Sequence, residues 1–190
     1  MPMIEGKGLI YSQPYYDTII LPAGAAGSVV GQLFAVPFGG LIAAAIPKNF
    51  RHTNLVQAGR LETGNELQID AISFHFPVTA EAGALPTVAD KRAVRSGSMR
   101  LQFGGDTEFL KIPNILIPSA GAGEVVVDGT VALNDIQPGV QVTQNKFFLK
   151  EPLVLKAQET ISVFIENMDV IAAPTELACV VWGTSLRPVR

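Results

Sequence analysis

The chain has 190 residues, of which 48% are hydrophobic and only 16% are charged, and its formal net charge is −3. This acidic balance argues against contact with nucleic acid, because general nucleic-acid binders are usually basic. A charged share well below the usual value of about 25% leaves few charges to cover a monomer, and it favours a subunit of an assembly.

Thirty consecutive residues near the start, Thr18 to Pro47, carry no formal charge. Three prolines and five glycines interrupt this run, whereas a membrane helix needs about 20 apolar residues with few breaks. Ser28 to Val36 is a candidate strand, and Leu41 to Ile46 is ambiguous between a strand and a helical turn. We expect residues 1–47 to form an apolar segment that packs on neighbouring subunits.

The clearest strand is Glu66 to Phe76, but its apolar pattern changes phase halfway along. Leu67 and Ile69 alternate on one face, whereas the apolar residues from Ile72 onward have the opposite parity. A β-bulge near Ala71 would restore a single inward face. The alternative is a strand that is covered on both faces.

The remaining chain shows short strands separated by turn signals. Val78 to Val94 is expected to be a loop. Ser98 to Phe103 and Thr107 to Ile112 are expected to form a hairpin around Gly104-Gly105-Asp106. The polar stretch Asp128 to Asn145 is expected to be a long surface or contact loop. Four further strand signals follow: Lys146 to Lys150, Pro152 to Ala157, Thr160 to Glu166, and Glu176 to Gly183.

These elements predict an all-β fold with eight to ten strands and little helix. The strand spacing is uneven and long loops join some strands, which favours an antiparallel β-sandwich over an up-and-down barrel. We expect one domain over residues 1–190, folded as an eight-stranded jelly roll with long loops.

No residue pattern for catalysis is evident, so no catalytic, cofactor-binding or metal-ligating residue is assigned. His52 and His75 are the only histidines, and they lack the His-x-His spacing of a cupin metal site. His52 is expected to be a surface or interface residue, and His75 a strand residue packed against a neighbour. Cys179 is expected to be a buried, inert thiol, and Asp70 is an unexplained charge within a strand.

The single cysteine excludes an intramolecular disulfide, and the first residues lack the pattern of a secretory signal. We therefore expect synthesis in a reducing cytoplasm. Four basic residues, Lys91, Arg92, Arg95 and Arg100, form a cluster in the sequence that suits nucleic acid or acidic lipid. A solvated loop, or salt bridges to a neighbouring subunit, is the favoured explanation because no aromatic residues are interleaved.

Five segments together resemble a known family: Thr53 to Leu61, Leu67 to Phe74, Phe147 to Leu155, Glu159 to Val163, and Val181 to Val189. Their order resembles the jelly-roll structural proteins of bacterial viruses, in particular the single jelly-roll capsid proteins of tailless, often membrane-containing phages. The resemblance implies a coat subunit that stands in a lattice of many copies, in a virion made in the host cytoplasm. The stretch Gly24 to Ile46 matches no specific element of that family.

We therefore expect a virion structural protein, a capsid subunit that self-assembles into an icosahedral shell and has no enzymatic activity or cofactor. Leu21 to Phe38 and Asp128 to Asn145 are the expected contact regions. The expected partners are further copies and other capsid proteins, and contact with an internal membrane stays open. The alternative is a phage spike or fibre head that binds a receptor or glycan through Tyr11, Tyr15 and Tyr16. A cupin-like enzyme is less favoured.

Overall fold

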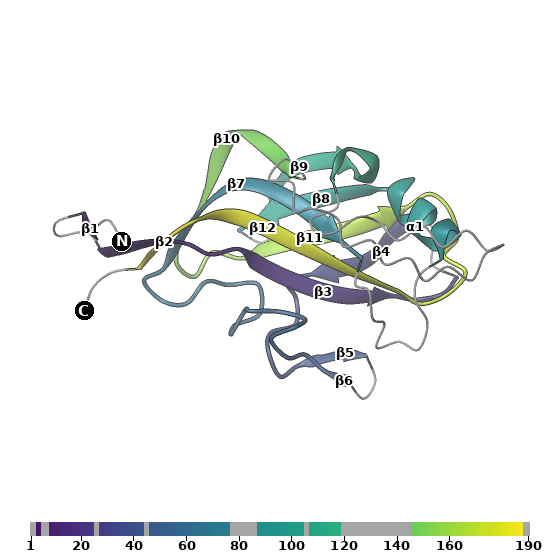
Figure 1. Cartoon of the computed structure of the whole chain (residues 1–190), viewed down its shortest axis with the longest axis horizontal. Coiled ribbons are helices and arrows are strands. Elements are labelled where there is room, and N and C mark those ends of the chain that lie inside the picture. Colours follow the sequence, from purple (N-terminus) through teal and green to yellow (C-terminus); the bar gives the residue numbers. More distant parts are fainter. Residues whose placement is uncertain are drawn as a thin grey trace, which may run out of the picture.

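A computed structural model describes the chain at residues 3–4, 8–24, 27–43, 46–76, 87–104, 107–118 and 146–187. These residues form two antiparallel sheets that face each other, with one short helix at one end (Figure 1). The predicted fold class, an all-β antiparallel sandwich, is confirmed. No helix among the described residues is long and apolar enough to cross a membrane.

The larger sheet, sheet A, has the strand order β1-β2-β12-β7-β10, and β3 also pairs with β12. The strands β2 and β3 pair with successive stretches of β12, on either side of Gln13 and Pro14. Proline has no N–H to donate to a neighbouring strand, which explains why the pairing with β12 is interrupted at Pro14. The strand bounds are β1 Met3–Ile4, β2 Gly8–Ser12, β3 Tyr15–Leu21, β7 Glu66–His75, β10 Phe147–Leu155 and β12 Thr175–Arg187.

The smaller sheet, sheet B, has the strand order β4-β11-β8-β9. A separate two-stranded hairpin, β5-β6, lies below both sheets in Figure 1. The remaining bounds are β4 Gly27–Leu33, β5 Leu41–Ala43, β6 Ile46–Pro47, α1 Val88–Arg95, β8 Ser98–Phe103, β9 Thr107–Pro113, the 3₁₀ turn η1 Asn114–Leu116, and β11 Ile161–Asn167.

The core lies between the two sheets and takes alternate residues from each long strand. Burying one such side chain fully contributes about 1.5–3 kcal/mol. Alternate apolar residues of β8, β11 and β12 are buried, apart from Phe103, which is partly buried against the core. The buried set on these strands is Met99, Leu101, Ile161, Val163, Ile165, Leu177, Cys179 and Val181.

The phase change in β7 is produced by a β-bulge, as predicted. Strand β12 pairs Trp182 with Ala71 and Gly183 with Ile69, so Asp70 is the extra residue of β7. The bulge turns the apolar residues on both sides of it toward the same core. The bulge therefore explains why a charged residue, Asp70, lies within this strand. Its carboxylate accepts a hydrogen bond from the side-chain amide of Gln68 at 3.0 Å.

The outer face of sheet A is also covered at its centre. Ala71, Ser73 and Ala178 lie on this face by alternation, and their exposed fractions are 1%, 0% and 7%. The indole Nε1 of Trp182 donates to the Ser73 hydroxyl at 2.7 Å. The two explanations offered for the β7 pattern, a bulge and a strand covered on both faces, therefore both apply.

The expected loop over residues 78–94 is wrong from residue 88 onward, where α1 begins. Thr87 is the N-cap: its hydroxyl accepts from the Asp90 amide at 3.2 Å, and the Asp90 carboxylate accepts from the Thr87 amide at 3.1 Å. This is a capping box with aspartate in place of the usual glutamate or glutamine. The Thr87-x-x-Asp90 spacing was the sequence signal for the helix, which is too short to show a clear helical period. Residues 78–86 lie outside the described part.

The two strand signals expected between residues 146 and 157 belong to one strand, β10, at the edge of sheet A. Its pairing with β7 shifts register between Phe148 and Leu153. Pro152 lies within this irregular stretch, and an edge strand tolerates proline because one side of its ladder has no partner strand. The hairpin of β8 and β9 is confirmed.

Candidate functional site

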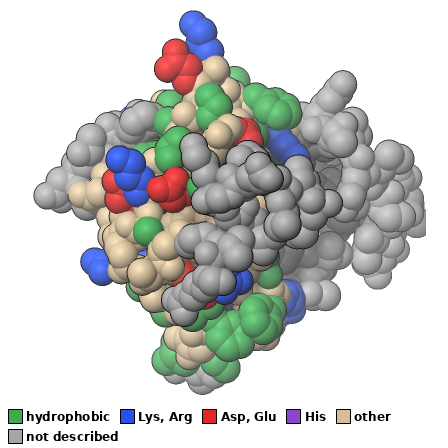
Figure 2. Space-filling view, turned by 90° about the vertical axis from the view of Figure 1, so that its left-hand side faces the viewer, with side chains coloured by type: hydrophobic (Ala, Val, Ile, Leu, Met, Phe, Trp, Pro, Cys, Tyr) green, Lys and Arg blue, Asp and Glu red, His purple; other side chains and the backbone are tan. Residues whose placement is uncertain are grey.

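The most distinctive surface of the described chain surrounds the β5-β6 hairpin. Phe38, Leu41 and Phe50 are 44%, 56% and 69% exposed, and we call these three residues the apolar patch. The rings of Phe38 and Phe50 lie 4.5 Å apart between centroids. Figure 2 shows hydrophobic side chains gathered at the lower end of the molecule, at the height of the hairpin in Figure 1. Exposed aromatic pairs of this kind are typical of contact surfaces.

The segment that carries the patch has an unusual charge distribution. Residues 18–61 contain no aspartate or glutamate, and their only lysine and arginines are Lys48, Arg51 and Arg60. The Lys48 ammonium is buried against the Asp17 carboxylate, and one Arg51 guanidinium nitrogen lies 3.8 Å from the buried carboxylate of Glu176. The patch therefore adjoins little free charge, as is usual at the centre of a protein–protein interface.

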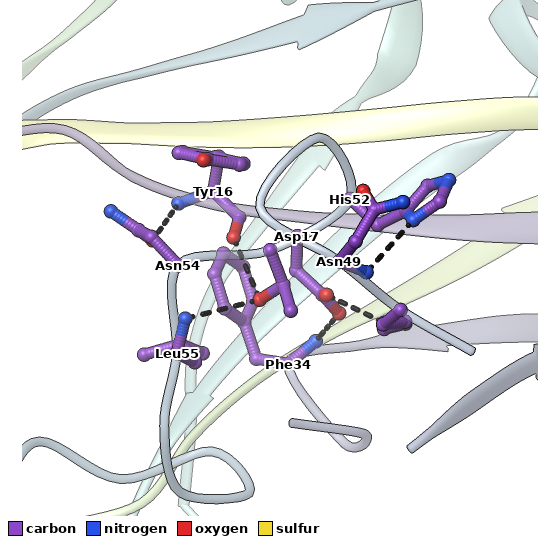
Figure 3. A network of polar contacts seen from close by, with 9 residues as sticks. Tyr16, Asp17, Phe34, Asn49, His52, Asn54 and Leu55 are labelled. Atoms are coloured by element: carbon purple, nitrogen blue, oxygen red, sulfur yellow. Dashed lines mark hydrogen bonds and ion pairs between the residues drawn. The ribbon is translucent and has the colours of Figure 1, made fainter. Parts of the chain in front are cut away.

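A buried ion pair fastens this segment to the sandwich (Figure 3). The Lys48 Nζ lies 2.5 Å from Asp17 Oδ1, and the two side chains are 1% and 0% exposed. The Phe34 amide donates to Asp17 Oδ2 at 2.6 Å. Phe34 has φ = 65°, an uncommon value for a residue other than glycine, and it turns the chain as it leaves β4.

Burial raises the pKa of the Asp17 carboxyl, while the Lys48 ammonium and the Phe34 amide act in the opposite direction. Sequence reasoning missed this pair. A signal was present, because Asp17 and Lys48 are the charged residues that border the uncharged run of residues 18–47 on its two sides. Two opposite charges that border an apolar run are well placed to meet when the run folds back on itself.

The segment after Lys48 runs along the free edge of β3. The Asn54 side chain accepts from the Tyr16 amide at 3.0 Å and donates to the Pro14 carbonyl at 2.8 Å. The Tyr16 hydroxyl donates to the Phe50 carbonyl, and burial raises its pKa. Thr53 forms an isolated bridge with Asp17. These contacts cover an edge strand that would otherwise be open to pairing with another chain.

His52 was expected to be a surface or interface residue, and this expectation is wrong: the side chain is 0% exposed. Its Nδ1 accepts from the Asn49 amide at 3.2 Å, within the turn that follows the hairpin. Figure 3 shows the Asn49 amide directed at the imidazole of His52. A polar loop in the sequence gave no indication that one of its residues would be fully enclosed.

Cys179 is fully buried in the core on β12, as predicted. Burial, together with the nearby Asp17 carboxylate, raises the pKa of its thiol. His75 lies at the end of β7, opposite Ala178 of β12, and is half-buried. Among the described residues, no group of three or more His, Cys, Asp or Glu side chains is arranged to hold a metal ion.

Arg100, the last of the four clustered basic residues, pairs within its own chain. Its Nε lies 3.0 Å from Glu166 Oε1, and its guanidinium stacks over the Phe164 ring at 5.4 Å. Glu166 also accepts from the Ser98 hydroxyl at 2.8 Å and from Lys111 at 3.1 Å. The charge of Arg100 is therefore balanced within its own chain and needs no acidic partner from a neighbouring subunit.

Lys91 and Arg95 lie on α1, and both approach the Phe76 ring, at 5.8 and 5.9 Å from its centroid. Lys91 is 7% exposed, and Arg95 donates to the carbonyls of Asn114 and Ile117. Of the four basic residues, Arg92 alone has an exposed side chain. The expected solvated loop is corrected for Lys91 and Arg95, which belong to a helix and whose long side chains pack back onto the protein.

Tyr15 and Tyr16 are neighbours on β3, so they point to opposite faces and do not share one cluster. The Tyr11 side chain lies outside the described part. A shallow pocket of about 180 Å³ opens beside Tyr15, and its lining includes Asn54, Arg60, Glu62 and Arg187. Polar groups predominate at its wall, and they come from segments far apart in the sequence.

The expected contact range of residues 21–38 is corrected in part. Leu21, Leu33 and Phe34 are 0–1% exposed and belong to the chain's own core. The apolar character of this stretch is therefore explained by β3 and β4, which contribute one strand to each sheet. Phe38 at its end is exposed and belongs to the apolar patch. The other expected contact region, residues 128–145, lies outside the described residues.

No family model, curated protein sequence or solved structure matches this chain.

Proposed function

We propose that the chain is a jelly-roll coat subunit of a virion, which self-assembles into an icosahedral shell. The strand order supports the jelly roll, and the observation that carries the coat role is the apolar patch. If β2 and β3 are taken as one interrupted strand, the described residues contain eight long strands, and the first, eighth, third and sixth of these in chain order lie side by side in sheet A. The other sheet runs second, seventh, fourth and fifth.

This order supports a jelly roll because four pairs of neighbouring strands match one another from the two ends of the chain inward. The first strand pairs with the eighth, the second with the seventh, the third with the sixth, and the fourth with the fifth. A long hairpin that wraps around itself produces such pairs. Jelly rolls serve as capsid, lectin and cupin domains. A jelly roll would be compatible with each of these classes and would not choose among them.

The apolar patch favours the capsid class. Phe38 and Phe50 present two aromatic rings to solvent beside the Leu41 side chain. Aromatic residues dominate the binding energy of protein interfaces when a neighbour covers them. The buried Asp17–Lys48 pair fixes the segment that bears them, so little conformational entropy remains to be lost on binding. The patch is therefore suited to contact a neighbouring coat subunit or a second capsid protein.

The variant Phe50→Ser tests this role, with Phe148→Ser as a matched control. Phe148 is 62% exposed on β10, so both substitutions remove an exposed ring of similar accessibility. Loss of an interface hot spot costs at least about 2 kcal/mol, or roughly 30-fold in a dissociation constant. Light scattering over a concentration series should show oligomers for the unmodified chain and for Phe148→Ser, and weaker association for Phe50→Ser.

Electron microscopy of the associated material should show closed shells. A clean monomer at high protein concentration would refute the proposal. Equal loss of association in both variants would show that the apolar patch is not a specific contact surface, because the loss of any exposed phenylalanine would then have the same effect.

A second candidate is a spike or fibre head that binds a glycan, and the polar pocket beside Tyr15 is the observation that favours it. Arg60 and Arg187 line this pocket together with Asn54, a combination that suits an acidic sugar. A glycan screen of the unmodified chain and of Arg60→Ala tests this candidate. Binding that the substitution abolishes would support it, and the absence of any binding would exclude it.

A further inference from the structure

The Asp17–Lys48 pair places an amine and a carboxyl group in direct contact within a buried site. The Lys48 Nζ lies 2.5 Å from Asp17 Oδ1, and the side chains are 1% and 0% exposed. The two residues are 31 positions apart in the chain. The contact joins β3 of the sandwich to the residue that follows β6, so it closes a large loop.

Burial makes the charged form of the Asp17 carboxyl costly. Isolated charges are costly to bury, and their mutual attraction repays that cost only with good geometry and further hydrogen bonds. Burial is the largest influence on Asp17 and raises the pKa of its carboxyl. The reaction needs a neutral amine beside a neutral acid, and transfer of one proton from the Lys48 ammonium to the Asp17 carboxylate would supply both.

The second carboxyl oxygen is held where an oxyanion needs a donor. The Phe34 amide donates to Asp17 Oδ2 at 2.6 Å, and Figure 3 shows this amide directed at the carboxyl group. A backbone N–H in a buried site stabilises the negative charge that develops on such an oxygen during acyl transfer. The fixed approach of the amine supplies a high effective concentration.

We propose that Lys48 and Asp17 condense to an isopeptide bond within the folded chain. The lone pair of the neutral Nζ attacks Cγ, the N–C bond forms, and Oδ2 carries the negative charge beside the Phe34 amide. Oδ1, which holds the proton received from lysine, takes a second proton from the nitrogen and leaves as water. One amide and one water are formed from one amine and one acid, and no oxidant or cofactor is needed.

The bond would tie the β5-β6 hairpin covalently to the sandwich, and both buried charges would disappear. It is independent of the proposed coat function, because it requires only the fold of one chain. A virion protein and a glycan-binding head would gain the same mechanical link between β3 and the projecting segment.

Mass spectrometry of the folded, unmodified chain tests the bond. The intact mass should be lower than the sequence mass by one water. Trypsin cuts after lysine and arginine, so an unlinked chain yields residues 8–48 and 49–51 as separate peptides. The linked chain should instead yield a single fragment of residues 8–51 that lacks one water, because trypsin does not cut after an acylated lysine.

The variant Lys48→Arg is the matched control, because it keeps the positive charge and the trypsin site but cannot form the amide. It should give the full mass and the two separate peptides. Should this variant fail to fold, digestion of the unmodified chain decides the question alone. The proposal is overturned when that folded chain gives only the unlinked peptides, or when the lost water maps to another place such as Asp128-Gly129.

Discussion

Replacement of Asp90 by alanine is expected to destabilise the fold more than any single surface change. The Asp90 side chain is fully buried and links two parts of the chain. One oxygen accepts from the Thr87 amide at 3.1 Å and from the Thr87 hydroxyl at 2.7 Å. The other accepts from the amides of Ala172 and Ala173 at 2.8 and 3.2 Å. The carboxylate thus holds the start of α1 against the loop between β11 and β12.

The magnitude follows from these contacts. Loss of the helix cap costs about 1 kcal/mol. The two alanine amides lose a charged acceptor, and because they are only partly buried, water can replace it at a cost of about 1 kcal/mol each. The free energy of unfolding should fall by about 3 kcal/mol. In a chain of this size the melting temperature falls by about 2–4 °C for each kcal/mol of lost stability, so it should fall by about 6–12 °C here.

Urea unfolding followed by the fluorescence of Trp182, the single tryptophan, measures this change. Asp169→Ala is the matched control, because Asp169 is an exposed carboxylate in the same loop, and its loss should change stability by less than about 0.5 kcal/mol. A value for Asp90→Ala within about 1 kcal/mol of the control would show that the carboxylate does not hold the helix to the loop.

The remaining predictions concern acid stability and close backbone contacts. Burial raises the pKa of Asp90, but hydrogen bonds, chiefly from the Thr87 hydroxyl, outweigh burial and bring the pKa below its usual value. The unmodified chain should therefore exceed Asp90→Ala in free energy of unfolding by the full amount above about pH 4. In urea titrations this difference should disappear as the pH falls through the folded-state pKa. The pKa of Glu166 is also lowered, and the hydroxyl of Ser98 is the largest influence on it. Glu166→Gln should nevertheless lower the free energy of unfolding by less than about 1 kcal/mol at neutral pH, because the ion pairs of Glu166 are partly exposed. A loss above about 2 kcal/mol would contradict this reasoning. Gly183→Ala should cost about 3 kcal/mol or more in thermal unfolding, because the added Cβ would lie 1.8 Å from the carbonyl oxygen of a neighbouring strand. Gly104→Ala, at φ = 65° with open space around it, should cost only about 1 kcal/mol. Equal losses of stability in the two glycine variants would show that the backbone at Gly183 moves enough to accommodate the added Cβ.

Much of the sandwich was predictable because strand periodicity is local. The alternation in β8 and β11 assigns each side chain to one face, whichever strand lies beside it. The phase change in β7 likewise predicted a bulge near Ala71, which the structure places at Asp70, because a period of two cannot otherwise keep Ile69 and Ile72 in one core. The low charge of the chain favoured a subunit of an assembly, and part of the apolar sequence behind that inference lies within the sandwich, in β3 and β4.

Long-range contacts decided what the sequence left ambiguous or misplaced. His52 lies in a polar stretch, and only the return of that stretch along the edge of β3 encloses it. Arg95 gains its carbonyl partners because η1 is brought beside α1. Asp17 and Lys48 meet because the uncharged run between them folds out and back as the β5-β6 hairpin. Sequence alone determined which residues prefer the core, since that preference depends on each side chain. Tertiary structure decided which polar groups became partners, since pairing depends on distances that chain order does not contain.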